Sequence, residues 1–165
     1  MQTDFKCVVV SDTHGDNRAM LEVIEREKPF DTLIHCGDVE GDLESILGTQ
    51  TFGYFSVAGN CDVFTDAPKE KDVKFGLWNV FVTHGHLYNV RFGRERLVRA
   101  GQSRKAHVIL YGHTHMPIVY EDERTGILVV NPGSLSRPRQ FPGKKTYAVL
   151  TISADRHPGA VVKYY

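Results

Sequence analysis

Five short strings of the chain carry carboxylate, imidazole and amide side chains at close spacing. They are Asp12-Thr13-His14, Gly37-Asp38, Gly59-Asn60-Cys61-Asp62, His84-Gly85-His86 and Gly112-His113-Thr114-His115. Carboxylate oxygens, imidazole nitrogens and amide oxygens are common protein ligands of divalent cations. Together the strings contain every residue type that a hydrolytic site with two metal ions needs, and most of them follow an apolar run or contain glycine.

Each string alone has an ordinary structural explanation. Asp-x-His and Gly-Asn pairs occur freely in turns, Asp38 can cap a helix, and a single histidine is more often a structural residue. The spacing favours ligands instead, because residues two apart at the end of a strand point the same way. Asp12 and His14 have this spacing, as do His113 and His115. The combined pattern predicts a metal centre at the ends of several strands.

The remaining histidines fit other roles. His107 begins a predicted strand and His157 lies in a polar turn, so we expect both to be structural. His35 precedes Cys36 within a predicted strand, and we expect it to pack or bond locally. His86 is either a neighbour of the metal ligands or a substrate contact.

Alternating strands and helices position the strings. β-branched and aromatic runs predict strands, and an apolar stripe with helical spacing predicts a helix. Strands are predicted at 5–10, 31–36, 54–58, 71–75, 79–83, 106–111, 118–122, 127–130, 146–153 and 160–164, and helices at 16–27, 43–47 and 91–100. We expect Gly101 to end the last helix. The Pro/Gly-rich loop at 131–145 is too long to be a mere connection, which indicates a function.

The order of these elements predicts a mixed α/β domain. Strand–helix alternation in the first part implies parallel pairing, and the strands of the last part indicate an antiparallel meander. The 165 residues fit a single domain, 1–165, because no Ser/Gly linker or repeat interrupts them. A chain of this length buries enough surface for a core without covalent staples.

Composition and charge argue against several classes of protein. Charged residues make up 24% of the chain and the formal net charge is zero, which argues against a dedicated nucleic-acid or membrane binder. No apolar run approaches the ~20 residues of a membrane span, and no secretory leader is visible. Three scattered cysteines suit a reducing compartment, so we expect a cytoplasmic location.

The two parts of the chain carry opposite charge. Residues 1–70 contain 14 acidic and 5 basic side chains, and residues 71–165 contain 6 acidic and 15 basic ones. We expect two solvated surfaces that neutralise each other when the parts pack. Alternatively, basic groups of the second part line the approach to an anionic substrate. The candidates are Arg91, Arg94, Arg137 and Arg139.

On these motifs the chain resembles the calcineurin-like metallophosphoesterase superfamily, whose signature runs D-x-H, G-D, G-N-H-[DE], a G-H or H-G element, then G-H-x-H. The small YfcE-type phosphodiesterases of that superfamily match best, because they carry cysteine where this chain has Cys61. Asn131-Pro132-Gly133-Ser134 also resembles that subfamily, so nearly the whole chain is covered. The resemblance implies a four-layer α-β-β-α sandwich of two mixed β-sheets flanked by helices.

The resemblance also implies a binuclear centre. Its ligands would be Asp12, His14, Asp38 and His115 for one ion, and Asp38, Asn60, His84 and His113 for the second, with Asp38 bridging. Mixed nitrogen and oxygen ligands suit Mn, Fe, Zn or Ni better than Mg or Ca, and the family favours Mn. A hydroxide that bridges the two ions would attack phosphorus in line with the leaving group.

The implied activity is that of a metal-dependent phosphoric ester hydrolase, a phosphodiesterase acting on a small substrate. Asn60, Cys61, Asp62 and His113 are the expected catalytic residues, and His86, Arg91, Arg137 and Arg139 the expected substrate contacts. Many relatives have histidine, paired with the following acid, in place of Cys61, and that histidine is assigned to protonate the leaving group. Cysteine is a weak donor, so its presence favours monoanionic diesters over dianionic monoesters. Alternatively, Cys61 is a buried spacer without a chemical role.

Other functions stay open from the sequence. The same site fits a phosphomonoesterase or a nucleotide pyrophosphatase. A non-catalytic scaffold that binds partner proteins belongs to a different class of function, and the intact set of ligands argues against it. A homo-oligomer is compatible with the apolar end of the chain, which equally suits a strand at the edge of the core.

Overall fold

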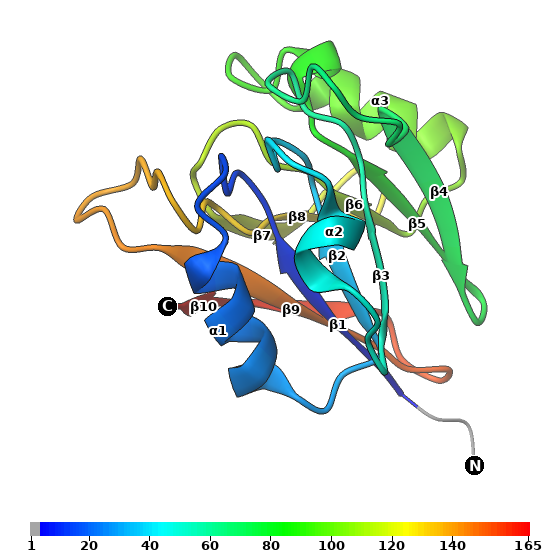
Figure 1. Cartoon of the computed structure of the whole chain (residues 1–165). Helices are drawn as coiled ribbons and strands as arrows, with labels where there is room; N and C mark the ends of the chain where they lie inside the picture. Colours follow the sequence, from blue (N-terminus) through cyan, green and yellow to red (C-terminus); the bar gives the residue numbers. More distant parts are fainter. Residues whose placement is uncertain (1–3) are drawn as a thin grey trace.

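The computed structural model describes residues 4–165, and in this part of the chain two five-stranded sheets face each other (Figure 1). The first sheet has the order β10-β9-β1-β2-β3 and comprises β1 (Phe5–Val10), β2 (Thr32–His35), β3 (Gly53–Ser56), β9 (Thr146–Ile152) and β10 (Gly159–Tyr164). The second has the order β4-β5-β6-β8-β7 and comprises β4 (Glu70–Phe75), β5 (Trp78–Thr83), β6 (Val108–Leu110), β7 (Ile118–Glu121) and β8 (Leu128–Asn131). The helices are α1 (Arg18–Glu27), α2 (Leu43–Leu47) and α3 (Glu95–Ser103), with a 3-10 turn, η1, at His86–Tyr88.

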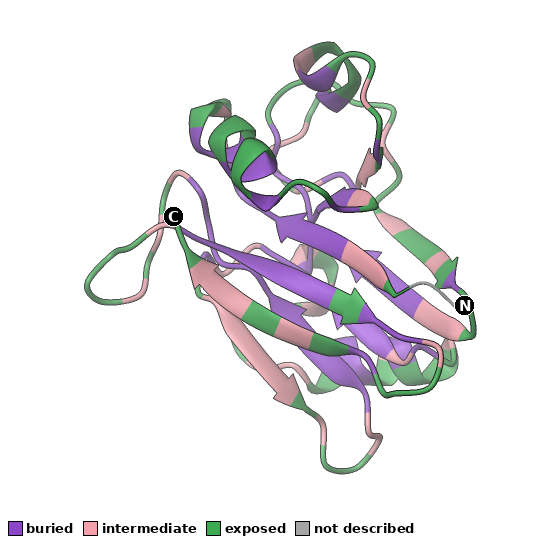
Figure 2. Cartoon of the chain, turned by 90° about the horizontal axis from the view of Figure 1, so that it is seen from below, coloured by how far each residue is buried: buried purple, intermediate pink, exposed green. Residues whose placement is uncertain are grey.

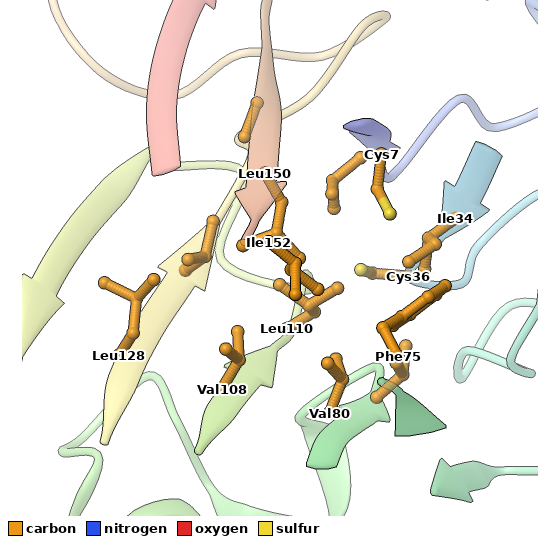
Figure 3. Packing of buried hydrophobic residues seen from close by; sticks show 14 of the residues in the cluster. Cys7, Ile34, Cys36, Phe75, Val80, Val108, Leu110, Leu128, Leu150 and Ile152 are labelled. Carbon is orange, nitrogen blue, oxygen red and sulfur yellow. The ribbon is translucent and has the colours of Figure 1, made fainter. Parts of the chain in front are cut away.

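The alternation of side chains along each strand divides the core into three apolar layers. In β1, Cys7 and Val9 belong to the layer between the sheets, whereas Val8 and Val10 pack with α1, because successive strand residues face opposite sides. Figure 3 shows the layer between the sheets. α1 and α2 cover the outer face of the first sheet and α3 that of the second. The central strands are largely buried, whereas the strands at the sheet edges are partly exposed (Figure 2). The four-layer sandwich is confirmed.

Both sheets are mixed. β1, β2 and β3 run parallel, as the strand–helix alternation predicted, and β9 adds to β1 in the antiparallel sense. The antiparallel meander expected in the last part is present only in pairs, β4–β5, β7–β8 and β9–β10. β5, β6 and β8 are parallel, because α3 connects β5 to β6 and the hairpin partner β7 lies at the edge of the sheet.

The helix predicted at 91–100 is displaced toward the carboxyl end and forms α3 at Glu95–Ser103. Asn89 and Gly93 have positive φ values of 52° and 159°, so the chain before Glu95 cannot continue a right-handed helix. Gly101 lies inside α3 rather than ending it. A Cβ atom there would lie 2.4 Å from Ile109 Cδ1, so this glycine permits the close approach of α3 to β6.

Other boundaries differ from the predictions by at most two residues. The helix predicted at 16–27 begins at Arg18, because His14 and Gly15 have positive φ values of 46° and 77°. Among residues 4–165, none of the helices is both long enough and apolar enough to cross a membrane.

A buried ion cluster joins α1 to the first sheet. Glu27, 5% exposed, lies in the last turn of α1, where a negative charge is unfavourable for the helix dipole. Its carboxylate accepts hydrogen bonds from Tyr147 Oη at 2.7 Å and Lys163 Nζ at 2.8 Å, and Lys6 Nζ lies 3.1 Å from Oε2. Burial alone would raise the pKa of Glu27, but these partners lower it from 4.5 to about 2.

We expect Glu27→Gln to reduce the free energy of unfolding by about 2 kcal/mol at pH 7, since the lysines are partly exposed and solvent screens them. The folded-state pKa lies below the unfolded value. The contribution of Glu27 is therefore present above pH 4.5 and is lost as the pH falls toward about 2. Urea unfolding at several pH values measures the difference. Glu25→Gln on the exposed face of α1 is the control, and an equal, pH-independent loss in both variants would contradict the assignment.

Candidate metal centre

The predicted ligands lie in loops that follow five strands. Asp12 and His14 follow β1, Asp38 follows β2, Asn60 follows β3, His84 follows β5, and His113 and His115 follow β6. β1, β2 and β3 are parallel, as are β5 and β6. Ligand sites gather at the carboxyl ends of such strands. The fold brings His14 and His115 together although 101 positions separate them in the chain, with 3.2 Å between their Nε2 atoms.

Five predicted ligands form overlapping groups whose donor atoms could share an ion. Asp12, His14 and His115 form one group, and Asp12, Asp38 and His84 form another, with all ligand atoms of a group within 4.8 Å of one another. His115 Nε2 lies 3.1 Å from Asp12 Oδ1, and His84 Nε2 lies 3.3 Å from Asp38 Oδ2. Asp12 and Asp38 are 0% and 2% exposed, so both carboxylates are held away from water among imidazoles.

Hydrogen bonds on the far side of three imidazoles set the tautomer that metal binding needs. Nδ1 lies 2.5 Å from Glu40 Oε1 in His14, 2.7 Å from Cys36 O in His84, and 2.7 Å from Arg137 O in His115. Carbonyl and carboxylate oxygens only accept, so each Nδ1–H donates and each neutral ring keeps a lone pair on Nε2. These three Nε2 atoms are the ones that face the carboxylates.

Several atoms of the cluster lack a partner that a cation would supply. Asp12 Oδ1 and His84 Nε2 are buried without a hydrogen bond in the part of the chain that the structure describes. Buried polar atoms are almost always paired. A cation would satisfy these atoms and would separate the two Nε2 lone pairs of His14 and His115. The donor set of carboxylates and imidazoles therefore fits a divalent transition-metal ion.

Five of the predicted ligands adopt the left-handed backbone conformation. φ is 55° at Asp12, 46° at His14, 55° at Asp38, 67° at His113 and 59° at His115. Residues other than glycine rarely adopt it, and it persists where surrounding contacts over-determine it, typically at functional sites. The loops are held in strained shapes that direct their side chains into the cluster.

Asp62 and His35 hold the loops that carry the ligands. Asp62 accepts hydrogen bonds from the backbone N–H groups of Asp38, Glu40 and Gly59 at 2.7–2.8 Å. His35 is 0% exposed, accepts from Gly37 N–H and lies 3.1 Å from Thr13 Oγ1. Burial lowers the pKa of His35 to about 4, so it bridges the two loops as a neutral ring.

The loop at 131–145 is attached to the same cluster. Ser134 and Ser136 both donate through Oγ to the backbone carbonyl of Asp12 at 2.8 Å. Asn131 Nδ2 donates to Gly112 O at 2.9 Å. The loop thus fixes the backbone of two ligand-bearing loops, and its Arg137 carbonyl orients His115.

Sequence reasoning missed Glu40, Ser134 and Ser136 as supports of the site. Glu40 lies two residues after Asp38 and directly contacts His14, so its proximity to a ligand in sequence was a usable signal. The serines act on a residue more than 120 positions away, and only the length of the 131–145 loop and the Asn-Pro-Gly-Ser string at its start drew attention to this segment.

Three further predicted site residues border the buried groups of donor atoms. Asn60 is exposed, and its Nδ2 donates to Cys61 Sγ at 3.3 Å. The His113 ring lies 5.1 Å from that of His84, and the His86 ring lies 5.4 Å from that of His84. Cys61 Sγ, by contrast, lies within 4.8 Å of ligand atoms of His14 and Asp38. A ligand role for Cys61 was not among the sequence-based alternatives.

Mutual charge lowers the pKa of both buried carboxyl groups. Burial alone would raise the pKa of Asp12, but His115 and His84 outweigh it and bring it below the ordinary value. The pKa of Asp38 is lowered likewise, because neighbouring His84 and the backbone N–H of Cys61 outweigh burial. Both groups are anionic at neutral pH and ready to bind a cation.

The pKa shifts of two side chains at the rim of the cluster, His113 and Cys61, favour their neutral forms instead. Burial lowers the pKa of His113 to about 4, and the nearby charges of His84 and Arg91 add to the effect. Burial and the charge of Asp38 raise the pKa of Cys61 to about 11. Arg91, Arg137 and Arg139 are exposed near the ligand loops, and the structure shows no carboxylate within ion-pair distance of them in residues 4–165.

Comparison with known proteins agrees with this geometry. The calcineurin-like phosphoesterase superfamily domain matches residues 5–155 of the chain. The chain belongs to this superfamily. Such metallophosphoesterases act on phosphoric esters, and five of the predicted metal ligands of this one form groups that could hold a metal ion.

Named relatives and solved structures extend the match over nearly the whole metallophosphoesterase. A Bacillus subtilis protein named probable metallophosphoesterase YsnB is 32% identical over 159 residues, covering 96% of this chain and 89% of that protein. A predicted phosphoesterase from Streptococcus pneumoniae has a TM-score of 0.82 and 28% identity, covering 99% of this chain and 100% of that one. The Escherichia coli phosphoesterase YfcE shares the fold at 24% identity and a TM-score of 0.63, over 88% of both chains.

Proposed function

We propose that this metallophosphoesterase is a phosphodiesterase that uses two divalent ions sharing Asp38. The observation that supports it most directly is the overlap of the ligand groups. Asp38 belongs to one group with His84 and Asp12 and to another with His14 and Cys61. One ion would be held by Asp12, His14, Asp38 and His115, and the other by Asp38, Asn60, His84 and His113.

When bound, two such ions polarise the phosphoryl oxygens and generate a nucleophile from water at neutral pH. Manganese is the proposed metal, with iron, zinc and nickel as alternatives that the nitrogen and oxygen ligands also suit. The chain itself supplies orientation. Glu40 and the Arg137 carbonyl fix two imidazoles, and Ser134 with Ser136 fixes the backbone of Asp12.

Charge at the rim supports a diester rather than a monoester. Asp12 and Asp38 are anionic, and Glu40 and Asp62 lie beside them. The Cys61 thiol adds no positive charge, and its pKa of about 11 keeps it neutral at pH 7. A monoester dianion would bring one negative charge more than a diester into these surroundings, and like charges repel strongly where water is excluded. We propose that four side chains contact the substrate at the open side, namely His86, Arg91, Arg137 and Arg139.

The direct test is hydrolysis by protein reconstituted with Mn²⁺. We expect kcat/KM for bis(p-nitrophenyl) phosphate to exceed that for p-nitrophenyl phosphate by at least about tenfold, which corresponds to about 1.4 kcal/mol. A preference for the monoester would replace the proposal by a phosphomonoesterase. Absence of hydrolysis with both esters and with a nucleoside pyrophosphate, despite bound metal, would favour a scaffold.

Cys61→His should change that preference. A histidine at this position can carry a proton to the leaving group and a positive charge toward the substrate, so we expect the diester-to-monoester ratio to fall at least about fivefold. Cys61→Ser, which has the same shape and no charge, is the matched control. An unchanged ratio in Cys61→His would identify Cys61 as a spacer.

A further inference from the structure

A cavity of about 320 Å³ opens beside the loop that carries His113 and His115. Thr114, which lies between those two ligands, is part of its wall. The backbone of Arg139 is hydrogen-bonded to this loop, since its N–H donates to the carbonyl oxygen of His115 at 3.2 Å. A group bound in the cavity would therefore lie next to the metal centre.

Three arginine residues line the cavity: Arg91, Arg94 and Arg139. They come from two segments of the chain, the turn before α3 and the loop after β8. No carboxylate in residues 4–165 lies within 4.0 Å of any of them. Like charges gathered in one cavity repel each other, and an anion between them would offset that repulsion.

Arg104 shows what a structural arginine looks like in this chain. Its guanidinium forms ion pairs with Glu70 and Asp72 across the edge of the second sheet. Arg94 has no such pair. It is half-buried with its guanidinium 5.3 Å from the ring centroid of Tyr120, which holds the side chain in position.

The rest of the wall is apolar. Val90, Met116, Pro117 and Ile118 line it, together with the buried ring of Tyr111. Arginine forks recognise phosphate and carboxylate oxygens in pairs of hydrogen bonds, and apolar walls suit the flat or aliphatic part of a substituent. The cavity thus combines three arginine residues with an apolar side, beside the loop that carries His113 and His115.

We propose that the cavity is a subsite for an ester substituent that carries a second phosphoryl group next to an apolar or planar portion, as in a phosphorylated nucleoside. The proposal rests on the proposed phosphodiesterase function and narrows its substrate class. Arg91, Arg94 and Arg139 bind the second phosphoryl group, and Met116 and Ile118 contact the apolar portion.

Two chromogenic diesters that differ by one phosphoryl group test the subsite. They are thymidine 5′-(p-nitrophenyl phosphate) and its 3′-phosphorylated form, both assayed with Mn²⁺-loaded protein. We expect KM for the 3′-phosphorylated form to be at least about fivefold lower in the wild type. In Arg91→Gln/Arg139→Gln, both replaced residues being exposed, the two KM values should become equal within about twofold. Arg99→Gln, on α3 outside this cavity, should keep the wild-type ratio.

Equal KM values in the wild type, or an unchanged ratio in the double variant, would overturn the subsite while leaving phosphodiester hydrolysis intact. If neither diester is hydrolysed, the proposed function fails instead. In that case, calorimetric titration with thymidine 3′,5′-bisphosphate and thymidine 5′-monophosphate still decides the subsite. We expect the bisphosphate to bind at least about fivefold more tightly than the monophosphate in wild type and Arg99→Gln only. Thermal unfolding of each variant checks that the fold is retained.

Discussion

Asp38→Asn should abolish phosphodiester hydrolysis and reduce the metal stoichiometry from two ions per chain to fewer than one at micromolar metal. Asp38 belongs to two of the three groups of donor atoms, as Asp12 and His14 also do, and we propose that its charge stabilises both ions. Metal ions contribute several kcal/mol to such reactions, and each 1.4 kcal/mol is a factor of ten in rate. We therefore expect kcat/KM for bis(p-nitrophenyl) phosphate to fall by at least about 10³-fold.

Two further variants, measured in the same way, serve as comparisons for Asp38→Asn. His84→Ala removes a ligand of only one proposed ion, so it should retain one ion per chain. Asp16→Asn makes the same chemical change at an exposed carboxylate on a neighbouring loop and should retain full activity. The asparagine at position 38 can still accept the backbone N–H of Cys61, which Asp38 Oδ1 accepts at 2.8 Å. Two bound ions in Asp38→Asn would contradict the shared role.

Among substitutions that add a single methyl group to the ligand loops, we expect Gly59→Ala to reduce stability and activity the most. A Cβ atom at Gly59 would lie 2.0 Å from Asp38 Oδ1 and 2.5 Å from Asp38 N, so either the loop or the carboxylate must move. Overpacking of a rigid site costs about 1–3 kcal/mol, occasionally more. We expect the free energy of unfolding to fall by about 3 kcal/mol, or the loop to shift, and activity to fall below about 1% in either case.

Gly159→Ala is the matched control, because a Cβ atom at Gly159 meets nothing within 4 Å and its φ needs no glycine. Its free energy of unfolding should change by less than about 0.5 kcal/mol. Denaturant unfolding and metal-dependent hydrolysis, measured on both variants, separate a general cost of alanine from the clash at Asp38. A Gly59→Ala protein with wild-type stability and activity would show that the loop yields easily.

The sequence sufficed to locate most of the cluster, for a simple geometric reason. Asp12, Asp38, His84 and His115 each follow an apolar run that forms a buried strand. When such strands are parallel, their carboxyl ends lie at one edge of the sheet. Residues that directly follow these strands therefore lie close together in the folded protein. The six-residue run Phe5–Val10 was predicted with correct bounds for the same reason, since its core-facing residues are uniformly apolar.

The contacts that hold the ligands could not be predicted in this way. Ser134 and Ser136 reach Asp12 only because β8 and β9 bring their loop across the end of the first sheet. The left-handed backbone at the ligands depends on the same tertiary contacts, since local preference opposes it. The prediction of where α3 begins was wrong for the same reason. The apolar spacing is helical from Arg91 onward, but the positive φ values at Asn89 and Gly93 delay the start of the helix to Glu95.

The ligands come from both sheets of the sandwich. Asp12, His14, Asp38 and Asn60 extend from the first sheet, and His84, His113 and His115 extend from the second. Ions bound by both sets would fasten the two sheets to each other at one end of the sandwich, in addition to the apolar packing between them. Separating the sheets would then require release of the ions, so the apparent folding stability would rise with the logarithm of free metal concentration. Metal supply would control not only the rate of hydrolysis but also how long each molecule stays folded.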